Sequence, residues 1–406
     1  MKHQKMKLKL LKSREMDRRA EEDSSTHSEI RLPSAARRHF SPDGAVVSVA
    51  SGEKDFSLRP RQAFLADLKK MSEDQKKYNT GFVTTATYNK IERAKKDRST
   101  IWLSEQLDDL VVGSDPEFGL VDGEGLFVYA SRRLEGKHDD KFGTDGPCME
   151  IRAEQSKSVE GHAKNIRKLI EEGSKITILE DLRWWTGATY KSSRQDRRYT
   201  LGGHIHIGDP GSINLLTNES ENRTTLHKRV IRVLDELVGL PLTKIDSPEP
   251  GYRRKTYGAF GDFRSQTNRL EWRTPSAIWL THPDLAIAVM GTTKAVTEEC
   301  YLVMSSAEKA PGWISAPASK PSFLKTMGCF TDTVVKRLLN DSKPDSLSNE
   351  QLSSLYKRLK KMSTYQKYKA YIDEFTKLTS LTSNDAGKVK LDGMKDNWLA
   401  GKALIR

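Results

Sequence analysis

Apolar and polar residues alternate one by one in several short stretches of the central part of the chain. In GGHIHIG, which covers residues 202–208, Ile205 and Ile207 alternate with His204 and His206. This alternation is typical of a strand with one buried face, and it places both imidazoles together on the other face. Three further stretches show the same pattern, namely VVGSDPEFGLV (111–121), CMEIR (148–152) and RLEWR (269–273). The sequence therefore predicts four strands, each with one apolar and one polar face.

Turn signals and helical spacing complete the central pattern. DGEG at 122–125 predicts a hairpin turn into LFVYA, and the glycine-rich GTDGP at 143–147 predicts a turn that leads into CMEIR. Apolar positions recur at helical spacing in three stretches, which are 158–171 closed by Gly173, 224–240, and Pro283 to about Met304. Antiparallel hairpins with helices laid on one side define an α+β fold.

The two ends of the chain differ in composition from its centre. Residues 1–105 are rich in charged residues and serine, and their helical signals lie at 64–78 and 87–96. From about residue 315 the chain turns polar again, with helical segments at 352–362 and 368–378. We predict three parts: a basic, flexible or partly helical extension (1–105), a central α+β domain (106–314), and a helical C-terminal region that packs on it (315–406).

Composition narrows the class of protein. The chain has 406 residues, of which 36% are hydrophobic and 30% charged, so it is long enough to bury a full core. No run of about 18 apolar residues could span a bilayer, and no signal peptide is recognisable, so we expect a cytoplasmic protein without a membrane span. Cys148, Cys300 and Cys329 are widely spaced and predict neither a disulfide framework nor a thiolate zinc site. The net charge of +13 favours anionic partners such as nucleotides or nucleic acid.

The polar faces of the four predicted strands carry the candidate chemistry. If the strands share one sheet that is covered by helices on its apolar side, their polar faces converge on a concave floor of carboxylates, imidazoles and guanidiniums. Taken singly, each charged pair could be an ordinary cross-strand ion pair, but four such faces together favour a site. The residues on this floor are Asp115, Glu117, Glu150, Arg152, His204, His206, Arg269, Glu271 and Arg273.

These residue types suit phosphate chemistry. Carboxylates with one or two imidazoles and no thiolate suit Mg²⁺ or Mn²⁺, which commonly bridge to substrate phosphates. Arginines grip phosphate oxygens and neutralise charge on a transferring phosphoryl group. The segment YRRKTYGAFGDFR (252–264) predicts a flexible basic loop that closes over phosphates, with Arg253, Arg254 and Arg264. No P-loop, GxGxxG, HExxH or GxSxG motif is present.

Five of these stretches, in order, closely resemble a known family. GSDPEFGLVDGEG, GTDGPCMEIR, GGHIHIG, YGAFGDFR and RLEWRTPSAIWL resemble the phage phiEco32-like carboxylate-amine ligases, within the glutamine synthetase and glutamate-cysteine ligase superfamily. The resemblance covers roughly residues 110–310. It implies an antiparallel sheet curved into a half-barrel, with helices on the convex face and with ATP and divalent metals on the concave face. The central domain would then be the catalytic domain.

The resemblance also implies a reaction and a role for each residue. The γ-phosphate of ATP would pass to a carboxylate, and an amine would attack the resulting acyl phosphate to form an amide. Asp115 departs from relatives that place two glutamates two apart, so it could be a weaker or water-mediated ligand, or only a turn residue. The implied metal ligands are Glu117, Glu150, His204 or His206, and Glu271, with Asp115 as the uncertain addition. The implied phosphate and transition-state arginines are Arg152, Arg264 and Arg273, and we add Arg253, Arg254, Arg269 and Tyr257 as nucleotide-binding residues.

Three functions follow from the sequence. The first is an ATP-dependent and Mg²⁺- or Mn²⁺-dependent ligase that joins a carboxylate to an amine, acting on an amino acid, a peptide or a cell-wall fragment. The second is a phage structural or nucleic-acid-associated protein that keeps the fold but uses its basic surface, with residues 1–105 as the docking or DNA-binding part. The third is a metal hydrolase that uses the two histidines with Zn²⁺. For a phage-encoded protein, the host cytoplasm or the virion is the expected location.

Overall fold

The computed structural model of the chain describes most of residues 107–401 and four residues before them. The described ranges are 39–40, 46–47, 107–108, 110–134, 141–193, 196–208, 220–246, 249–266, 269–306, 326–341, 343, 346–380 and 390–401. Within residues 1–91 these comprise only β1 (His39–Phe40) and β2 (Val46–Val47), which pair antiparallel. The predicted helices at 64–78 and 87–96, and the nucleic-acid or virion partner predicted for residues 1–105, lie outside the described residues.

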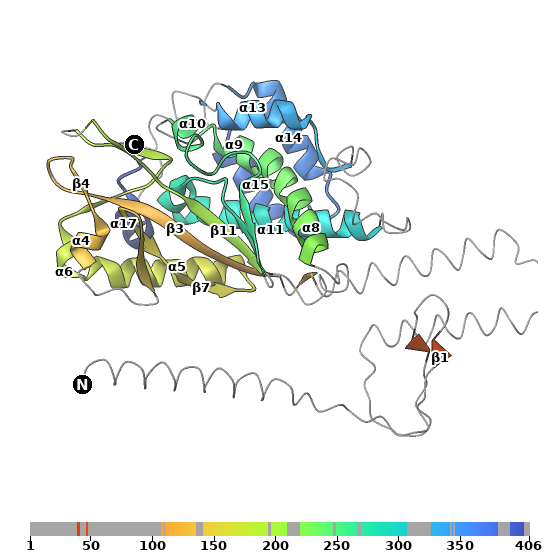
Figure 1. Cartoon of the computed structure of the whole chain (residues 1–406), viewed down its shortest axis with the longest axis horizontal. Coiled ribbons are helices and arrows are strands. Elements are labelled where there is room, and N and C mark those ends of the chain that lie inside the picture. The colour runs from red at the N-terminus through yellow and green to blue at the C-terminus, as the bar shows by residue number, and fades with distance from the viewer. Residues whose placement is uncertain are drawn as a thin grey trace, which may run out of the picture. The chain divides into compact units, whose positions relative to one another are not determined.

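An antiparallel sheet forms the centre of the unit that spans residues 92–406 (Figure 1). It has nine strands, and the order along its main path is β12-β13-β11-β3-β6-β5. β4, β7 and β8 also pair with β3, while β9 and β10 form a separate hairpin. The strands are β3 (Val111–Val121), β4 (Phe127–Val128), β5 (Phe142–Asp145), β6 (Cys148–Ile151), β7 (Ala153–Ser156), β8 (Arg183–Trp185), β9 (Thr189–Lys191), β10 (Arg198–Thr200), β11 (Gly203–Gly208), β12 (Phe263–Ser265) and β13 (Arg269–Trp272).

Helices cover the apolar face of this sheet and continue into the C-terminal region. α5 packs on β7, α8 packs on β12, and α11 contacts α5, α8 and α15 (Figure 1). The helices are α4 (Ala130–Leu134), α5 (Val159–Ser174), α6 (Thr177–Glu180), α8 (Ser220–Leu234), α9 (Leu240–Leu242), α10 (Pro250–Arg253), α11 (Pro283–Ser306), α13 (Asp332–Asn340), α14 (Asn349–Lys360), α15 (Lys369–Leu378) and α17 (Met394–Ala400), with a π-helix η2 (Asp235–Gly239) and a 3-10 helix η3 (Ala277–Thr281). None of the helices in the described part is long and apolar enough to cross a membrane.

The predicted alternation of apolar and polar residues is confirmed in all four strands. The apolar side chains on one face of each strand are completely buried in the main core, together with residues of α5, α8 and α11. These core side chains are Val112, Phe118 and Leu120 of β3, Met149 and Ile151 of β6, Ile205 and Ile207 of β11, and Leu270 and Trp272 of β13. The α+β class with an antiparallel sheet is therefore confirmed. The side chains between these core residues lie on the opposite face of the sheet.

Several predicted boundaries differ from the structure for local reasons. GTDGP is not only a turn, because Phe142–Asp145 forms β5 and hydrogen-bonds antiparallel to β6, with Gly146 at φ +54° between them. Gly173 does not close its helix, because α5 continues to Ser174; its missing Cβ instead leaves room for the rings of Trp184 and Phe142. The helix predicted for 224–240 turns into a π-helix at Asp235, which directs this buried carboxylate toward the indole of Trp272.

Candidate active site

A continuous band of ligand and guanidinium side chains crosses five adjacent strands on the face opposite the helices. Antiparallel pairing places alternate residues of neighbouring strands side by side, with Cβ atoms about 5 Å apart. The directly paired positions are Arg264 with Glu271, Glu271 with His206, His204 with Asp115, and Glu117 with Glu150. The convergence predicted from strand parity is therefore produced by the register of β12, β13, β11, β3 and β6.

Asp115 lies at the centre of this band, between the two imidazoles. Its Oδ1 atom is 3.3 Å from Nδ1 of His204 and 3.2 Å from Nε2 of His206. Burial opposes ionisation of Asp115, but the close contacts with both histidines and their positive charge hold its pKa well below its usual range. Asp115 is part of β3 and not a turn residue, so the suggestion that it only makes a turn is wrong.

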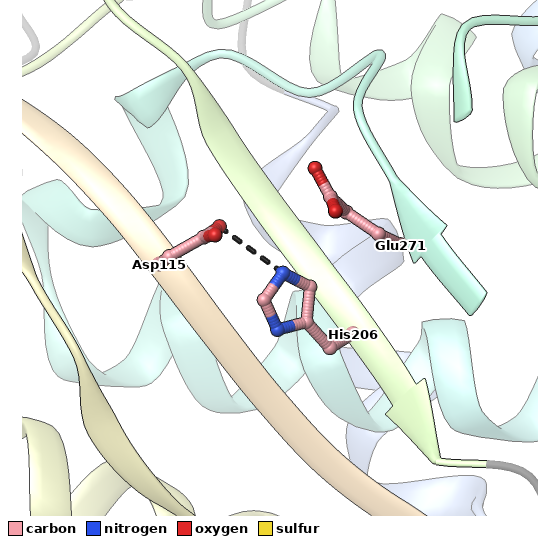
Figure 2. Close-up of side chains that lie close together, drawn as sticks. All are labelled: Asp115, His206 and Glu271. Atoms are coloured by element: carbon pink, nitrogen blue, oxygen red, sulfur yellow. Dashed lines mark ion pairs between the residues drawn. The ribbon is translucent and has the colours of Figure 1, made fainter. Parts of the chain in front are cut away.

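Asp115, His206 and Glu271 form a candidate metal site (Figure 2). One ligand atom from each lies within 4.8 Å of the other two, and Figure 2 shows the three side chains directed toward one another from three strands. Oδ1 of Asp115, Oε1 of Glu271 and Nε2 of His206 are buried and have ion-pair contacts of 3.2–3.3 Å, but none of the three forms a well-aligned hydrogen bond within the described ranges. Buried polar atoms are costly when unsatisfied, so two carboxylate oxygens and an imidazole nitrogen with this arrangement fit a bound divalent cation.

Glu117 and Glu150 form a second acidic pair beside this cluster. Oε2 of Glu117 accepts hydrogen bonds from the backbone N–H of Gly202 at 2.8 Å and from the hydroxyl of Tyr257 at 2.9 Å. Burial raises the pKa of both glutamates, against the effect of His204 on Glu117 and of Arg152 on Glu150. Two carboxylates that resist ionisation next to each other are the kind of group that a cation would stabilise in the charged form.

The structure places three predicted arginines against the carboxylates of the band. Nε of Arg152 donates to Oε1 of Glu150 at 2.6 Å. Nη1 of Arg264 and Nε of Arg273 each lie 3.3 Å from Oε1 of Glu271. The side chain of Arg264 is 57% exposed and that of Arg273 is 18% exposed, so both can reach a ligand that lies on this face.

The other predicted nucleotide-binding residues have different positions. Arg253 is completely buried and donates to the carbonyls of Thr274 at 2.8 Å and Arg273 at 3.0 Å, so it holds the backbone that follows β13. Arg254 is buried as well, and burial lowers its pKa to about 10. Arg269, at the start of β13, donates to the side-chain oxygen of Gln266 at 2.7 Å. Of this set, Tyr257 reaches the band directly, through Glu117.

Two glycines and one aspartate of the site were not singled out from the sequence. Gly143 lies opposite Glu150, and a Cβ there would come within 2.6 Å of the guanidinium of Arg152. Gly202 precedes β11 and supplies the N–H that Glu117 accepts. Asp262 accepts from the N–H of Gly258 and lies 3.6 Å from Arg273. Gly143, Gly202 and Asp262 stand in motifs that are visible in the sequence. The residues that they contact depend on the register between strands, which the sequence does not show.

Replacing Gly143 by Ala should disturb Arg152 without unfolding the protein. The new methyl group would displace the flexible end of Arg152 from Glu150, and Gly143 needs no left-handed backbone conformation. We expect catalytic turnover to fall roughly tenfold, as for loss of one charge-assisted hydrogen bond, with stability changed by less than about 1 kcal/mol. Turnover assays and urea unfolding measure both quantities. Gly123→Ala, which meets nothing within 4 Å, is the control, and equal turnover in the two variants would contradict a role for Arg152.

The antiparallel sheet with acids, imidazoles and arginines on one face defines an α+β protein with a candidate cation site. A family model described as phage phiEco32-like COOH.NH2 ligase-type 2 matches residues 112–385, and the chain belongs to this family. The family predicted from the motifs is confirmed, and the match continues beyond residue 314 through α13, α14 and α15. The protein is accordingly an amide-forming carbon–nitrogen ligase.

Solved structures show distant similarity over much of the chain. A bifunctional glutathione synthetase from Pasteurella multocida has 10% identity and a TM-score of 0.40, with 74% of this chain and 50% of that chain covered. The complex between the prokaryotic ubiquitin-like protein Pup and its ligase PafA has 10% identity and a TM-score of 0.40, covering 73% and 68%. A glutamine synthase homolog has 13% identity and a TM-score of 0.32, covering 67% and 75%. No curated protein sequence matches the chain.

Proposed function

We propose that the protein joins a carboxylate to an amine through an acyl phosphate, with ATP and either Mg²⁺ or Mn²⁺. The γ-phosphoryl group passes to an oxygen of the carboxylate and ADP leaves. The amine nitrogen then attacks the acyl carbon, phosphate leaves, the amine loses one proton and the amide remains. The observation that carries this proposal is the cluster of Asp115, His206 and Glu271, whose ligand atoms are buried, close together and without a well-aligned hydrogen bond in the described part of the chain.

The residues of the band divide into three roles. Asp115, His206 and Glu271 hold one cation, and Glu117, Glu150 and His204 extend the ligand set toward β6. A bound cation offsets negative charge on the phosphoryl group. Arg264 and Arg273 bind phosphate oxygens at the β12–β13 side, because their guanidiniums already lie next to Glu271. Arg152, at the opposite side, stabilises charge at the reacting carboxylate. The sheet curves as a half-barrel around this band.

Two other predicted functions are less well supported. The metal hydrolase would need a tightly held Zn²⁺, whereas two of the three cluster ligands are carboxylates, which suit harder cations. The nucleic-acid-associated protein rests on residues 1–105 and on net charge, and family membership does not favour it. The metal content of the purified protein distinguishes the metal hydrolase from the ligase, because the hydrolase would retain tightly bound Zn²⁺. DNA binding whose affinity falls steeply with salt concentration would support the nucleic-acid-associated protein.

Asp115→Asn tests the proposed function. Hydroxylamine in place of the amine traps an acyl phosphate as a hydroxamate, so activation can be measured without knowing the natural amine. We expect wild-type protein to release ADP with Mg²⁺ or Mn²⁺ and a pool of carboxylates, and Asp115→Asn to lose roughly a hundredfold or more because a cation ligand is lost. Asp284→Asn, an exposed acid in the first turn of α11, is the matched control. Metal-independent ADP release, or full activity of Asp115→Asn, would contradict the proposal.

A further inference from the structure

The backbone that follows Tyr257 is fixed to neighbouring elements by hydrogen bonds. Three backbone N–H groups between Tyr257 and β12 donate to side-chain oxygens. The pairs are Gly258 with Asp262 at 2.6 Å, Phe260 with Asn340 at 2.8 Å, and Gly261 with Asp235 at 2.6 Å. The carbonyl of Asp262 in turn accepts from the N–H of Arg273 at 3.2 Å. These hydrogen bonds hold Tyr257 in a defined position relative to β13.

Arg253 fixes the ring of Tyr257 from within the protein. Its guanidinium carbon lies 4.4 Å from the centre of the ring. The same guanidinium donates to the carbonyls of Thr274 and Arg273, so it is itself anchored on the backbone after β13. A guanidinium that lies over an aromatic ring is a favourable contact, and it favours one orientation of the ring.

The hydroxyl of Tyr257 is the part of this side chain that reaches the band. It donates to Oε2 of Glu117 at 2.9 Å, and the same oxygen accepts from the N–H of Gly202 at 2.8 Å. Two donors on one carboxylate oxygen determine how the carboxylate is turned. They therefore also determine where the other oxygen, Oε1, lies.

Oε1 of Glu117 lies next to a buried nitrogen of His204. A Cβ on Gly202 would be 2.9 Å from Oε1 of Glu117 and 2.6 Å from Nε2 of His204, so both atoms border the small space that Gly202 leaves. Nε2 of His204 is buried and forms no hydrogen bond within the described ranges, whereas Nδ1 faces Asp115. The ring of Tyr257 lies edge-on to that of His204, with centroids 6.1 Å apart. Tyr257 therefore contacts both side chains that border this space.

We propose that Tyr257 is a positioning residue that orients Glu117 for cation binding, rather than a residue that binds the nucleotide. This inference rests on the cation site of the proposed function and deepens it. A carboxylate ligand depends on the hydrogen bonds that hold it, and loss of such a partner lowers metal affinity roughly ten- to hundredfold. The guanidinium carbon of Arg273 lies 5.8 Å from the ring centre of Tyr257, so this side chain also connects the ligand set with a phosphate-binding arginine.

Binding of Mn²⁺ alone, without nucleotide, tests this role independently of turnover. Tyr257→Phe removes the hydroxyl and keeps the ring that Arg253 and Arg273 contact. We expect the Kd of Mn²⁺, measured by calorimetry, to rise roughly tenfold or more. Urea unfolding without Mn²⁺ checks that the variant is folded. Tyr252→Phe is the matched control, because it removes the same hydroxyl from an exposed tyrosine of α10, and it should leave the Kd unchanged.

Turnover distinguishes the hydroxyl of Tyr257 from its ring. In Tyr257→Phe, the Mg²⁺ concentration for half-maximal ADP release should rise by about the same factor as the Kd of Mn²⁺. The kcat at saturating Mg²⁺ and the KM of ATP should change less than roughly threefold, because the reacting groups are untouched. Tyr257→Leu also removes the ring beside Arg273, so we expect its KM of ATP to rise roughly three- to fivefold in addition.

Each outcome supports or overturns the positioning role. Equal Mn²⁺ affinity of wild type and Tyr257→Phe, or equal losses in Tyr257→Phe and Tyr252→Phe, would overturn it and leave the ligase standing. A raised KM of ATP in Tyr257→Phe with unchanged Mn²⁺ affinity would overturn it as well, because the hydroxyl would then act on the nucleotide. A wild-type protein that binds no Mn²⁺ would leave Tyr257 no cation ligand to position. If Tyr257→Phe weakens Mn²⁺ binding but wild type releases no ADP with any carboxylate, the proposed ligase reaction fails and the positioning role stands.

Discussion

Glu117→Gln is expected to abolish ligase turnover while making the protein more stable. The side chain of Glu117 is only 3% exposed, and burial raises its pKa, which means that the folded state disfavours its ionised form. A neutral amide of the same shape can still accept from Gly202 and Tyr257, but it cannot supply the negative charge that a cation needs. We expect turnover to fall by roughly a hundredfold or more and the free energy of unfolding at pH 7 to rise by about 1 kcal/mol.

ADP release and urea unfolding at pH 7 measure the two effects of this substitution. Glu154→Gln, an exposed glutamate of β7, should change neither turnover nor stability by a measurable amount. Glu117→Asp keeps the charge but withdraws the carboxylate, so it should lose turnover without gaining stability. A variant Glu117→Gln that keeps wild-type turnover would remove Glu117 from the ligand set. A large loss of stability would show instead that the charge itself holds Tyr257 and Gly202 in place.

Opposite effects on activity and stability are the expected signature of a preorganised site. The band concentrates acids and arginines on one sheet face, where several buried oxygen and nitrogen atoms lack hydrogen-bond partners among the described residues. Such an arrangement is unfavourable for folding and is retained where a ligand compensates it. The same argument explains why Asp115 and Glu271 are held by strands, whose backbone hydrogen bonds fix the side chains within the narrow range that cation binding requires.

The faces of the strands could be predicted because strand periodicity is local. Ile205 and Ile207 point into the core, and His204 and His206 point away from it, as alternation requires. The central position of Asp115 could not be predicted in the same way. It depends on the pairing of Asp115 with His204 and of His206 with Glu271, and register between distant strands is set by the whole sheet. Composition and periodicity contain no information about that register.

Whether a long side chain is buried or exposed could not be predicted from the sequence either. Arg253 and Arg264 occur in one basic segment, yet Arg253 is buried against the carbonyls of Thr274 and Arg273, whereas Arg264 is exposed on β12. The positive φ of Gly258 and its missing Cβ leave the space that the guanidinium of Arg253 fills. A charged residue next to a glycine is compatible with a flexible phosphate loop or with a tightly packed turn, and only tertiary contacts distinguish the two.

His162 should make the stability of the protein strongly dependent on pH below neutrality. It is completely buried in α5, where Nε2 lies 2.8 Å from the hydroxyl of Ser114 on β3 and Nδ1 lies 2.8 Å from the carbonyl of Glu154. Burial lowers the pKa of His162 to about 4, against a usual value near 6.5. The folded protein therefore keeps this imidazole neutral at pH values where the unfolded chain takes up a proton.

The direction of the effect follows from proton binding in the two states. Between pH 6.5 and about 4 the unfolded state binds the extra proton, so the stability that depends on neutral His162 is complete above pH 6.5 and is lost as pH falls. At about 1.4 kcal/mol per pH unit, the loss approaches about 3 kcal/mol near pH 4. His162→Gln has no titrating group at this position and should lack this part of the pH dependence, although its stability at pH 7 is lower.

Urea unfolding of wild type and His162→Gln at a series of pH values measures the difference directly. The carboxylates that titrate in the same range are common to both proteins and cancel in the comparison, so the gap between the two free energies of unfolding should narrow steadily below pH 6.5. A constant gap would mean that His162 is protonated in the folded state.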